Sequence, residues 1–399
     1  VPYFYDYPAR AMRIIGVTGT NGKTTTTYLL REIFTCAGFK VGLIGTIQIL
    51  IGDETFPNPN TTPNVIDLQK ILVDMRDKNI QVVVMEVSSH ALAENRVAGI
   101  EFDTAIFTNL TQDHLDFHGT MENYLRAKTK LFDMVSRRGR KQNKTAVINI
   151  DDAASSEVLK HCLCKKITYG IKNPADLQAT ELEIKSSGMN FKIGDEMNLS
   201  LHLTGLFNVY NILAAVGAAL AENIRSDIIK RALENFKSVP GRFERLEKNL
   251  PFEVIIDYAH TPDGVAKVLE TARQITKGKI ITVVGCGGDR DHKKRPIMGK
   301  TAADLSDVLI ITSDNPRTED PEKILDEIEV GIDKNNYERI TDRRAAIFRA
   351  IELAKAGDIV LVLGKGHETY QILNTGKIHF DDREVAIAAT KNIGGIKNE

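Results

Sequence analysis

The sequence predicts an α/β protein in which a doubly wound central domain is followed by a smaller, Rossmann-like α/β domain. Apolar runs of strand length alternate with helical patterns along most of the chain, and this alternation is typical of parallel sheets. The pattern changes at 179–205, where apolar and polar residues alternate as in half-exposed antiparallel strands, and it resumes after Ser238-Val239-Pro240-Gly241. We therefore expect a linker at 1–11, a central domain at 12–238 and a C-terminal domain at 239–399.

The strongest motif of the central domain is a glycine-rich turn, Thr18-Gly19-Thr20-Asn21-Gly22-Lys23-Thr24-Thr25, between a predicted strand at 13–17 and a helical pattern. Glycines let backbone N–H groups approach phosphate oxygens, and a helix N-terminus adds positive potential. Lys23 can reach the terminal phosphates of ATP, and the Thr24 hydroxyl can bind Mg²⁺. The usual spacing would place a glycine at Val17, so we interpret the turn as a variant phosphate loop (P-loop) of an ATPase domain. A plain strand-to-helix turn is the alternative.

The charge balance and the cysteines argue against several classes of protein. Lys and Arg total 52 and Asp and Glu total 53, so we expect no nucleic-acid partner. The 4 cysteines are too scattered for a disulfide framework, and His161-Cys162-Leu163-Cys164 lacks the second ligand pair of a metal site. We find no apolar run of membrane-spanning length and no signal-peptide pattern. We therefore expect a cytoplasmic monomer without membrane insertion.

The remaining elements follow from hydrophobic periodicity and turn residues. We expect a helix at 65–75 that starts at Thr62-Pro63, with Thr62 as its cap. The other expected elements of the central domain are strands at 41–46, 81–87, 104–108 and 145–149, antiparallel strands at 181–184, 189–193 and 197–203, and helices at 121–132, 208–221 and 226–236. The expected strands of the C-terminal domain are 254–257, 280–284, 308–312 and 359–363.

Polar residues follow the predicted strands of the central domain. Glu86 ends an apolar strand, and ligands of open α/β sheets lie beyond the carboxyl ends of strands. Glu86 is therefore placed to hold the Mg²⁺ that Thr24 also contacts, whereas a carboxylate that caps the next turn is the alternative. The run at 109–118 follows another strand and is dense in metal-type ligands. His114 within it is a candidate metal ligand, and a structural histidine is the alternative.

Four polar loops follow predicted strands of the C-terminal domain. They are Asp257-Tyr258-Ala259-His260, Gly285-Cys286-Gly287-Gly288-Asp289-Arg290-Asp291, Asp314-Asn315-Pro316-Arg317 and Gly364-Lys365-Gly366-His367-Glu368. Each loop alone is consistent with an ordinary turn. Four such loops at the same edge of one sheet predict a binding site.

Together these segments resemble the Mur ligases, which are ATP-dependent amino-acid ligases of peptidoglycan precursor synthesis. The resemblance covers nearly the whole chain and is closest to the members that add the third residue of the stem peptide. Besides the phosphate loop, the matching segments are MEVSSHAL at 85–92, TNLTQDHLDFHG at 108–119, GLFNVYNILAA at 205–215, PGRFE at 240–244, DYAHTPD at 257–263, GCGGDRDHKKRP at 285–296, DNPR at 314–317 and GKGHE at 364–368. The resemblance implies an ADP-forming ligase of cell-wall biogenesis, on which cell shape and division depend.

The resemblance also implies a role for individual residues. Lys128 matches a lysine that CO₂ converts to a carbamate, although the sequence alone would place it on the surface of a helix. The implied catalytic residues are Lys23, Lys128 and His114. Two Mg²⁺ ions are implied, held by Thr24, Glu86, His114 and Lys128. The implied nucleotide-binding residues are Gly19, Thr20, Asn21, Gly22, Lys23, Thr24, Thr25, Asn211, Arg242 and Asp257. The implied contacts to the nucleotide-sugar peptide are Thr61, Thr62, Ser89 and Arg96, and those to the amino acid are Arg290, Asp314, Asn315, Arg317, Gly364 and Glu368.

Arg317 bears on which amino acid is added. The resemblance offers lysine or meso-diaminopimelate, and only the latter has a second carboxylate at its far end. The planar fork of Arg317 can hold that carboxylate in two parallel hydrogen bonds, Arg290 can take the other carboxylate, and Asp314 and Glu368 can take the distal ammonium. We therefore predict meso-diaminopimelate. The alternative is that Arg317 is a solvated arginine beside Glu319.

The implied reaction forms an amide through an acyl phosphate. A D-glutamyl carboxylate attacks the γ-phosphate of ATP, and the incoming amine then displaces phosphate. Family members begin with a domain that holds uridine nucleotide, whereas only the predicted linker precedes the phosphate loop here. Either a first domain is missing from this sequence or the protein works without it. A two-domain folyl- or polyglutamate-forming ligase and a non-catalytic Mur-like subunit are the alternatives.

Overall fold

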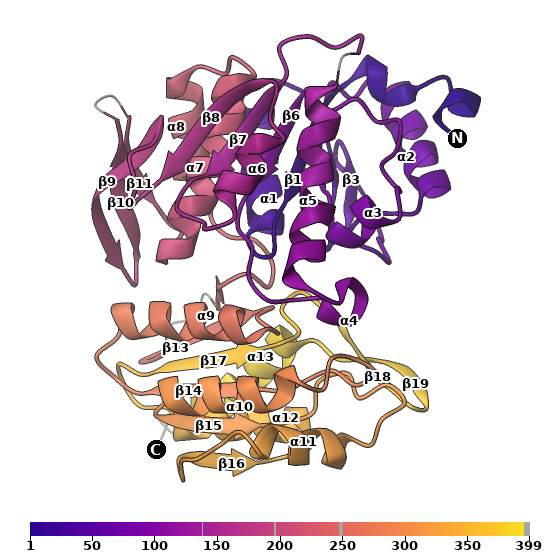
Figure 1. Cartoon of the computed structure of the whole chain (residues 1–399). Coiled ribbons are helices and arrows are strands. Elements are labelled where there is room, and N and C mark those ends of the chain that lie inside the picture. Colours follow the sequence, from indigo (N-terminus) through magenta and orange to yellow (C-terminus); the bar gives the residue numbers. More distant parts are fainter. Residues whose placement is uncertain (138, 195–196, 247–249, 395–399) are drawn as a thin grey trace. The chain divides into compact units, whose positions relative to one another are not determined.

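The computed structural model describes residues 1–137, 139–194, 197–246 and 250–394 of the 399-residue chain. The chain divides into two compact units, Val1–Lys237 and Ser238–Glu399, which we call unit 1 and unit 2 (Figure 1). In each unit, helices cover both faces of a largely parallel sheet, which confirms the predicted α/β fold class. No helix in the four described ranges is both long and apolar enough to cross a membrane.

The described residues of unit 1 form an 11-stranded sheet in the order β11-β10-β9-β8-β7-β6-β1-β5-β2-β3-β4. Its strands are β1 Arg13–Thr18, β2 Val41–Ile44, β3 Ile49–Ile51, β4 Glu54–Phe56, β5 Val82–Glu86, β6 Thr104–Phe107, β7 Thr145–Asn149, β8 Lys165–Gly170, β9 Leu177–Lys185, β10 Gly188–Ile193 and β11 Met197–Leu201. The strands from β8 to β2 run parallel, whereas antiparallel pairs occupy the two edges. The central strands are buried runs of apolar and β-branched residues, because helices cover both faces.

The helices of unit 1 form a layer on each face of this sheet (Figure 1). They are η1 Pro2–Tyr5, η2 Pro8–Ala11, α1 Lys23–Cys36, α2 Val65–Asp77, α3 Ser89–Ala93, α4 Leu115–His118, α5 Met121–Ser136, α6 Ser155–Lys160, α7 Leu206–Ala221 and α8 Ser226–Asn235. Leu72 of α2 and Phe132 of α5 share one hydrophobic core with Ile14 and Val83 of the sheet. The alternate strand residues, such as Ile15, face the layer in which α1 and α7 pack together.

Two local expectations for unit 1 differ from the structure. Thr62 does not cap the first long helix after β4; Asn64 does, because its side-chain oxygen accepts hydrogen bonds from the backbone N–H groups of Ile66 and Asp67. Residues 1–11, expected as a linker, form η1 and η2, and Ala9 is 3% exposed within the core. The first residues of the chain therefore pack as part of unit 1.

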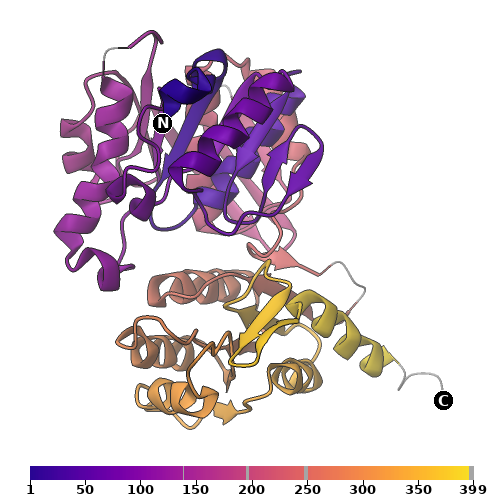
Figure 2. The same cartoon turned by 90° about the vertical axis from the view of Figure 1, so that its right-hand side faces the viewer.

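The described residues of unit 2 form a 6-stranded sheet in the order β12-β13-β17-β14-β15-β16 and a separate hairpin. The strands are β12 Glu244–Arg245, β13 Glu253–Asp257, β14 Ile280–Val284, β15 Val308–Ile311, β16 Tyr337–Arg339 and β17 Ile359–Leu363, with β18 Tyr370–Leu373 and β19 Gly376–His379 in the hairpin. The helices are α9 Pro262–Ile275, α10 Lys294–Leu305, α11 Pro321–Glu329, α12 Arg343–Leu353 and α13 Asp382–Gly394. α12 and α13 cover one face of the sheet, and α9, α10 and α11 form the layer on the other (Figure 2).

A buried ion pair joins α12 to α13. Arg343 begins α12, Asp382 begins α13, and both side chains are 0% exposed. The guanidinium donates to the two carboxylate oxygens at 2.7 and 2.6 Å and to the carbonyl oxygen of Leu363 at 2.9 Å. Since an unpaired buried cation is costly, each partner depends on the other.

Replacing Asp382 with alanine should lower the free energy of unfolding by about 3–5 kcal/mol, because Arg343 would stay buried without its carboxylate. Urea unfolding followed by circular dichroism measures this loss. Glu384→Ala is the matched control, since Glu384 also lies in the first turn of α13 but pairs with His379 in solvent. An Asp382→Ala variant with the stability of the control would contradict the expected role of the pair.

Candidate functional site

The phosphate loop connects the end of β1 to the start of α1. Gly22 has φ of 87°, and a Cβ at this position would lie 2.3 Å from Oδ1 of Asn211, so only glycine fits between the loop and α7. The Lys23 ammonium donates to the carbonyl oxygens of Gly19 at 2.9 Å and Thr20 at 2.7 Å. The loop thus combines a helix N-terminus with an ammonium group, and both favour phosphate binding.

Asn109 fixes the phosphate loop from the end of the neighbouring strand β6. Its carbonyl oxygen accepts from the backbone N–H of Thr20, and its side-chain oxygen accepts from that of Asn21, both at 2.9 Å. Its amide also donates to the carbonyl oxygen of Asn21 at 3.1 Å, to which the Thr108 hydroxyl donates at 2.7 Å. The run at 109–118 therefore supports the loop as well as carrying His114.

Lys128 lies at the phosphate loop although it belongs to α5. Its side chain is 1% exposed, and Nζ donates to the carbonyl oxygen of Gly19 at 2.8 Å and lies 4.3 Å from the centre of the Tyr124 ring. Burial, and after it the neighbouring Lys23 ammonium, hold the pKa of Lys128 well below its ordinary value. The lowered pKa favours the neutral amine over the ammonium form.

Three histidines, His90, His114 and His118, gather beside Tyr124. The ring centres of His90 and His114 are 4.7 Å apart, and those of His118 and Tyr124 are 5.0 Å apart. Burial lowers the pKa of all three, and that of His114 falls to about 4 although the Asp113 carboxylate lies 3.2 Å from Nε2. His114 is thus neutral near pH 7, which is the form of imidazole that binds metal ions.

Glu86 lies beside the phosphate loop because its strand β5 pairs with β1, Glu86 opposite Val17. Its carboxylate is fully buried and accepts from the backbone N–H of Thr46 at 2.8 Å and from the Thr46 hydroxyl at 3.0 Å. Each oxygen retains a further lone pair. The Thr61 hydroxyl is 3.0 Å from that of Thr46, and the Thr62 hydroxyl donates to the Glu86 carbonyl oxygen at 2.8 Å. Thr62 therefore contacts the candidate metal ligand directly, and Thr61 contacts Thr46, which binds it.

Ser89 and Arg96 lie at the same edge of the sheet. The Ser89 hydroxyl is 3.0 Å from Nε2 of His118, and Arg96 donates to the carbonyl oxygen of Thr62 at 3.1 Å. The structure thus brings the four residues expected to contact the nucleotide-sugar peptide together around the end of β5.

The residues at this edge fit Mg²⁺ better than a transition metal. Thr24 is buried on the first turn of α1 and supplies a hydroxyl, and Glu86 supplies a carboxylate. Mg²⁺ commonly takes one or two carboxylates together with substrate phosphates and water. Across the described ranges, no three His, Cys, Asp or Glu side chains are grouped closely enough to hold a metal ion. The donor set therefore suits an ion that shares its ligands with a bound phosphate.

In unit 2, Asp257 organises the residues expected to contact nucleotide. It ends β13, and its carboxylate accepts from the backbone N–H groups of Phe243 at 2.6 Å and Ala259 at 2.7 Å. Burial raises the pKa of Asp257. The Arg242 guanidinium carbon lies 4.4 Å from the centre of the Tyr258 ring. Asp257 thus ties together the two backbone segments that carry Arg242 and Tyr258.

Asn315 connects two of the loops expected to bind the amino acid. Its amide donates to a carboxylate oxygen of Glu368 at 2.8 Å, and its side-chain oxygen accepts from Lys365 at 3.1 Å. The fully buried Lys365 ammonium also donates to Glu368 at 3.0 Å. Gly364 packs against Asp314, since a Cβ there would lie 2.6 Å from a carboxylate oxygen of Asp314. Four of the five expected residues of these two loops therefore meet around Lys365, to which the sequence analysis had given no role of its own.

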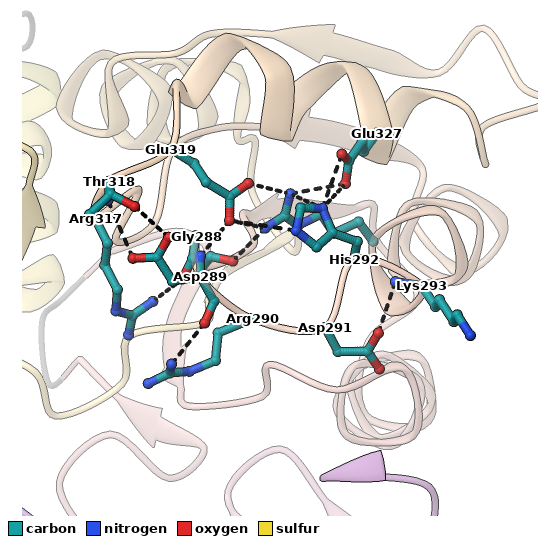
Figure 3. Close-up of polar contacts among 12 residues, drawn as sticks. Gly288, Asp289, Arg290, Asp291, His292, Lys293, Arg317, Thr318, Glu319 and Glu327 are labelled. Carbon is teal, nitrogen blue, oxygen red and sulfur yellow. Dashed lines mark hydrogen bonds and ion pairs between the residues drawn. The ribbon is translucent and has the colours of Figure 1, made fainter. Parts of the chain in front are cut away.

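The side chains of Arg290 and Arg317 come from adjacent loops (Figure 3), and both lie beside Gly287, where a Cβ would be 3.8 Å from Cγ of Arg290 and 2.9 Å from Nη1 of Arg317. Arg317 is half-buried, and its Nη1 donates to the carbonyl oxygens of Gly288 at 2.6 Å and Asn315 at 3.4 Å. Its Nε and Nη2 make no hydrogen bond with the described part of the chain. Arg290 is exposed and donates to the carbonyl oxygen of Asp289 at 2.9 Å. Both guanidinium groups therefore keep donors for a further partner.

A fully buried arginine, Arg295 on the first turn of α10, lies behind these loops. It donates to both carboxylate oxygens of Glu319 at 2.9 Å, to Glu327 at 2.9 Å and to the carbonyl oxygen of Gly287 at 3.1 Å. Hydrogen bonds from Arg295 lower the pKa of Glu319 to about 2. His292 lies 3.0 Å from Glu327 at the margin of this cluster.

Sequence reasoning assigned no individual role to four residues that shape these sites: Asn109, Lys365, Arg295 and Glu319. Asn109 and Lys365 lie in runs that directly follow predicted strands, which is a signal that could have identified them. Arg295 and Glu319 are 24 residues apart and carry no such local signal.

Comparison with protein-family models matches residues 17–219 to the Mur ligase middle domain and residues 241–366 to the Mur ligase glutamate ligase domain. The UDP-N-acetylmuramoyl-L-alanyl-D-glutamate–2,6-diaminopimelate ligase of Clostridium botulinum is 50% identical over 395 residues, which are 98% of this chain and 80% of the relative. The ligase of the same name from Bacillus velezensis is 49% identical over 387 residues, 96% of this chain and 79% of the relative.

Two solved structures are also similar to this chain. A structure of a UDP-N-acetylmuramoyl-L-alanyl-D-glutamate–2,6-diaminopimelate ligase matches with a TM-score of 0.67 at 36% identity, covering 98% of this chain and 81% of that one. Folylpolyglutamate synthase of Mycobacterium tuberculosis, complexed with ADP and AMPPCP, matches with a TM-score of 0.73 at 17% identity, covering 98% and 93%. At that identity the second likeness concerns the fold alone.

The ion pair of Glu319 should make unit 2 less stable in acid. Because the folded-state pKa of about 2 lies below the ordinary value of 4.5, the pair contributes fully above pH 4.5 and is lost as the pH falls through 2. The difference in unfolding free energy between the wild type and Glu319→Gln should therefore shrink by about 2 kcal/mol from pH 7 to pH 3. Urea titrations at several pH values measure it. A difference that does not change with pH would contradict the low pKa.

Proposed function

The chain belongs to the Mur ligase family, and we propose that it joins meso-diaminopimelate to UDP-N-acetylmuramoyl-L-alanyl-D-glutamate with conversion of ATP to ADP and phosphate. The relatives that are named UDP-N-acetylmuramoyl-L-alanyl-D-glutamate–2,6-diaminopimelate ligase are about half identical to the chain over nearly its whole length. The single observation that carries the choice of amino acid is the pair Arg290 and Arg317. They present two guanidinium groups on adjacent loops of unit 2.

The residues of unit 1 suit the activation of a carboxylate. ATP is the substrate that supplies the phosphoryl group, and Mg²⁺, when bound, offsets the charge on its phosphates. We assign Lys23 and the N-terminus of α1 to those phosphates, because both place positive charge at the loop. Thr24 and Glu86 are the assigned ligands of one Mg²⁺. The acyl phosphate of the substrate carboxylate is then open to attack by the amine of the incoming amino acid.

We assign Lys128 as a carbamylated lysine that supplies an oxygen ligand for a second Mg²⁺, with His114 beside it. Carbamylation requires a neutral amine: its lone pair forms a C–N bond to CO₂, and the nitrogen loses a proton to give the carbamate anion. The burial of Lys128 and the nearby Lys23 charge favour the neutral amine. The carbamate would also place a negative charge beside the Lys23 ammonium, where the neutral amine has none.

Lys128→Ala should reduce kcat by at least about a hundredfold, and short carboxylic acids such as acetate should restore part of it by replacing the carbamate oxygen. The loss of kcat and its recovery with acetate are measured by the release of phosphate from ATP in the presence of UDP-N-acetylmuramoyl-L-alanyl-D-glutamate (the nucleotide dipeptide) and meso-diaminopimelate. Lys130→Ala is the matched control, since Lys130 lies on the same helix and donates to the carbonyl oxygen of Leu92.

Labelling with ¹³C-bicarbonate provides an independent measurement of the modification. The wild type and Lys130→Ala should show a carbamate signal by NMR, and Lys128→Ala should not. Normal activity in Lys128→Ala, or a wild type without the signal under turnover conditions, would contradict the assignment.

Selectivity for the amino acid follows from the second carboxylate of meso-diaminopimelate. A charge-assisted bidentate pair contributes about 1.5–3 kcal/mol, which is roughly tenfold to a hundredfold in affinity. Lysine lacks that carboxylate and would leave the site's arginine unpaired, so the same group that binds one substrate penalises the other. Glu368, which accepts hydrogen bonds from the Lys365 ammonium and the Asn315 amide, is the assigned partner of the distal ammonium.

The wild type should use meso-diaminopimelate at least about tenfold better than lysine in kcat/KM, and Arg317→Ala should remove most of this preference. Product formation by mass spectrometry with each amino acid measures it. Arg344→Ala, which changes an exposed arginine on α12, should keep the wild-type preference.

The same assay separates the other candidate activities. Preference of the wild type for lysine would contradict the assigned amino acid, and turnover of a folyl acceptor in place of the nucleotide dipeptide would indicate a polyglutamate-forming ligase. Absence of any ATP turnover would indicate a non-catalytic subunit.

A further inference from the structure

We propose that Glu319 and Arg295 are positioning residues for the amino-acid substrate: their ion pair holds the loops that carry Arg290 and Arg317 at the spacing that an amino acid with two carboxylates requires. The inference rests on the proposed function, which assigns the two arginines to the two carboxylates of meso-diaminopimelate. Neither Glu319 nor Arg295 has to touch the substrate for this role.

Glu319 belongs to one loop and binds the other. Its backbone N–H donates to the carbonyl oxygen of Pro316 at 3.0 Å, within the loop that carries Arg317. Its carboxylate accepts from the backbone N–H of Asp289, the residue directly before Arg290 (Figure 3). Asp289 has φ of 53°, a left-handed conformation that is uncommon for residues other than glycine and that its surroundings help to hold. The Glu319 carboxylate is part of those surroundings.

Thr318 makes a second connection between the same loops. Its hydroxyl donates to the Asp289 carboxylate at 2.7 Å. The backbones also meet directly, because the N–H of Gly288 donates to the carbonyl oxygen of Asn315 at 2.9 Å, and a Cβ at Gly288 would lie 1.9 Å from the carbonyl oxygen of Pro316. The separation of Arg290 from Arg317 is therefore set by contacts that include Glu319 and Thr318.

Arg295 orients the Glu319 carboxylate. Its guanidinium is fully buried, binds both Glu319 oxygens, and donates to the carbonyl oxygen of Gly287 in the loop that carries Arg290. Such a two-pronged pair fixes the plane of the carboxylate, which a single contact does not. Lying in the first turn of α10, where a cation is disfavoured by the helix dipole, Arg295 needs carboxylates to offset its charge.

Glu327 of α11 helps to neutralise the charge of Arg295 but does not connect the two loops, so it distinguishes these two effects of a carboxylate. It binds the same guanidinium at the same 2.9 Å, but its described hydrogen bonds go to Arg295 and His292 and not to the loop that carries Arg317. A substitution of Glu327 therefore removes a carboxylate from Arg295 and leaves the connection between the two loops intact. Glu327→Gln is thus a matched control for Glu319→Gln.

The test compares the full-length wild type with Glu319→Gln, Thr318→Val and Glu327→Gln in steady-state assays. Glu319→Gln should raise KM for meso-diaminopimelate roughly tenfold or more, leave KM for ATP and kcat within about twofold, and reduce the preference over lysine by roughly tenfold. Thr318→Val, a change at an exposed residue, should shift KM and preference in the same direction by about threefold. Glu327→Gln should match the wild type in all four quantities.

Thermal melts show whether each variant is folded. If Glu319→Gln does not fold, the KM and the amino-acid preference of Thr318→Val test the inference. Equal changes in KM for meso-diaminopimelate and in amino-acid preference in Glu319→Gln and Glu327→Gln would overturn the inference. Such a result would mean that the carboxylates only neutralise Arg295 and that the connection between the loops has no effect. Unchanged amino-acid KM in the folded loop variants would overturn it as well. A wild type that does not turn over meso-diaminopimelate overturns the proposed function and the inference with it, and that outcome is visible in the wild-type assay alone.

Discussion

Both candidate sites depend on one constraint: neighbouring parallel strands end at the same edge of a sheet. β1 lies between β5 and β6, so the residues that follow these three strands meet, and the phosphate loop touches Asn109 and lies beside Glu86. In unit 2, β13, β17, β14 and β15 are adjacent, and the loops after β15 and β17 meet through the side chains of Asn315, Lys365 and Glu368. The register of the strands therefore decides which side chains can act together, since a slip of one residue would turn each of them to the opposite face.

Signals that are local in the sequence predicted the fold class, the phosphate loop and the polar loops at the strand ends. Buried strands are continuous apolar runs, and a polar residue directly after such a run marks the edge of the sheet. The prediction of a helix cap at Thr62 was wrong for a reason that is not local. The Thr62 hydroxyl is bound to the carbonyl oxygen of Glu86, 24 residues away, and the adjacent Asn64 caps α2 in its place.

The burial of two cations, Lys128 and Arg295, could not be predicted from the local sequence, because it depends on packing between distant segments. A lysine in an amphipathic helix normally lies on its surface, and only the packing of α5 against the sheet buries Lys128 beside Gly19. Arg295, likewise, lies in a segment rich in lysine and arginine that reads as solvated, and its burial requires carboxylates from two other elements. Buried cations of this kind are costly unless paired, so each one constrains the elements that supply its partners.

The ion pair between Arg343 and Asp382 links the C-terminal helix to the site proposed for the amino acid in unit 2. Arg343 also binds the carbonyl oxygen of Leu363, the last residue of β17, and the loop that carries Glu368 begins at the next residue. One guanidinium thus connects α13 to the start of a loop that is proposed to bind the amino acid. Proteolytic removal of α13 would leave Arg343 without Asp382, and the loop that begins at Gly364 would lose this connection to α13. A single cut before α13 should therefore abolish both the resistance of unit 2 to further digestion and the ligase activity.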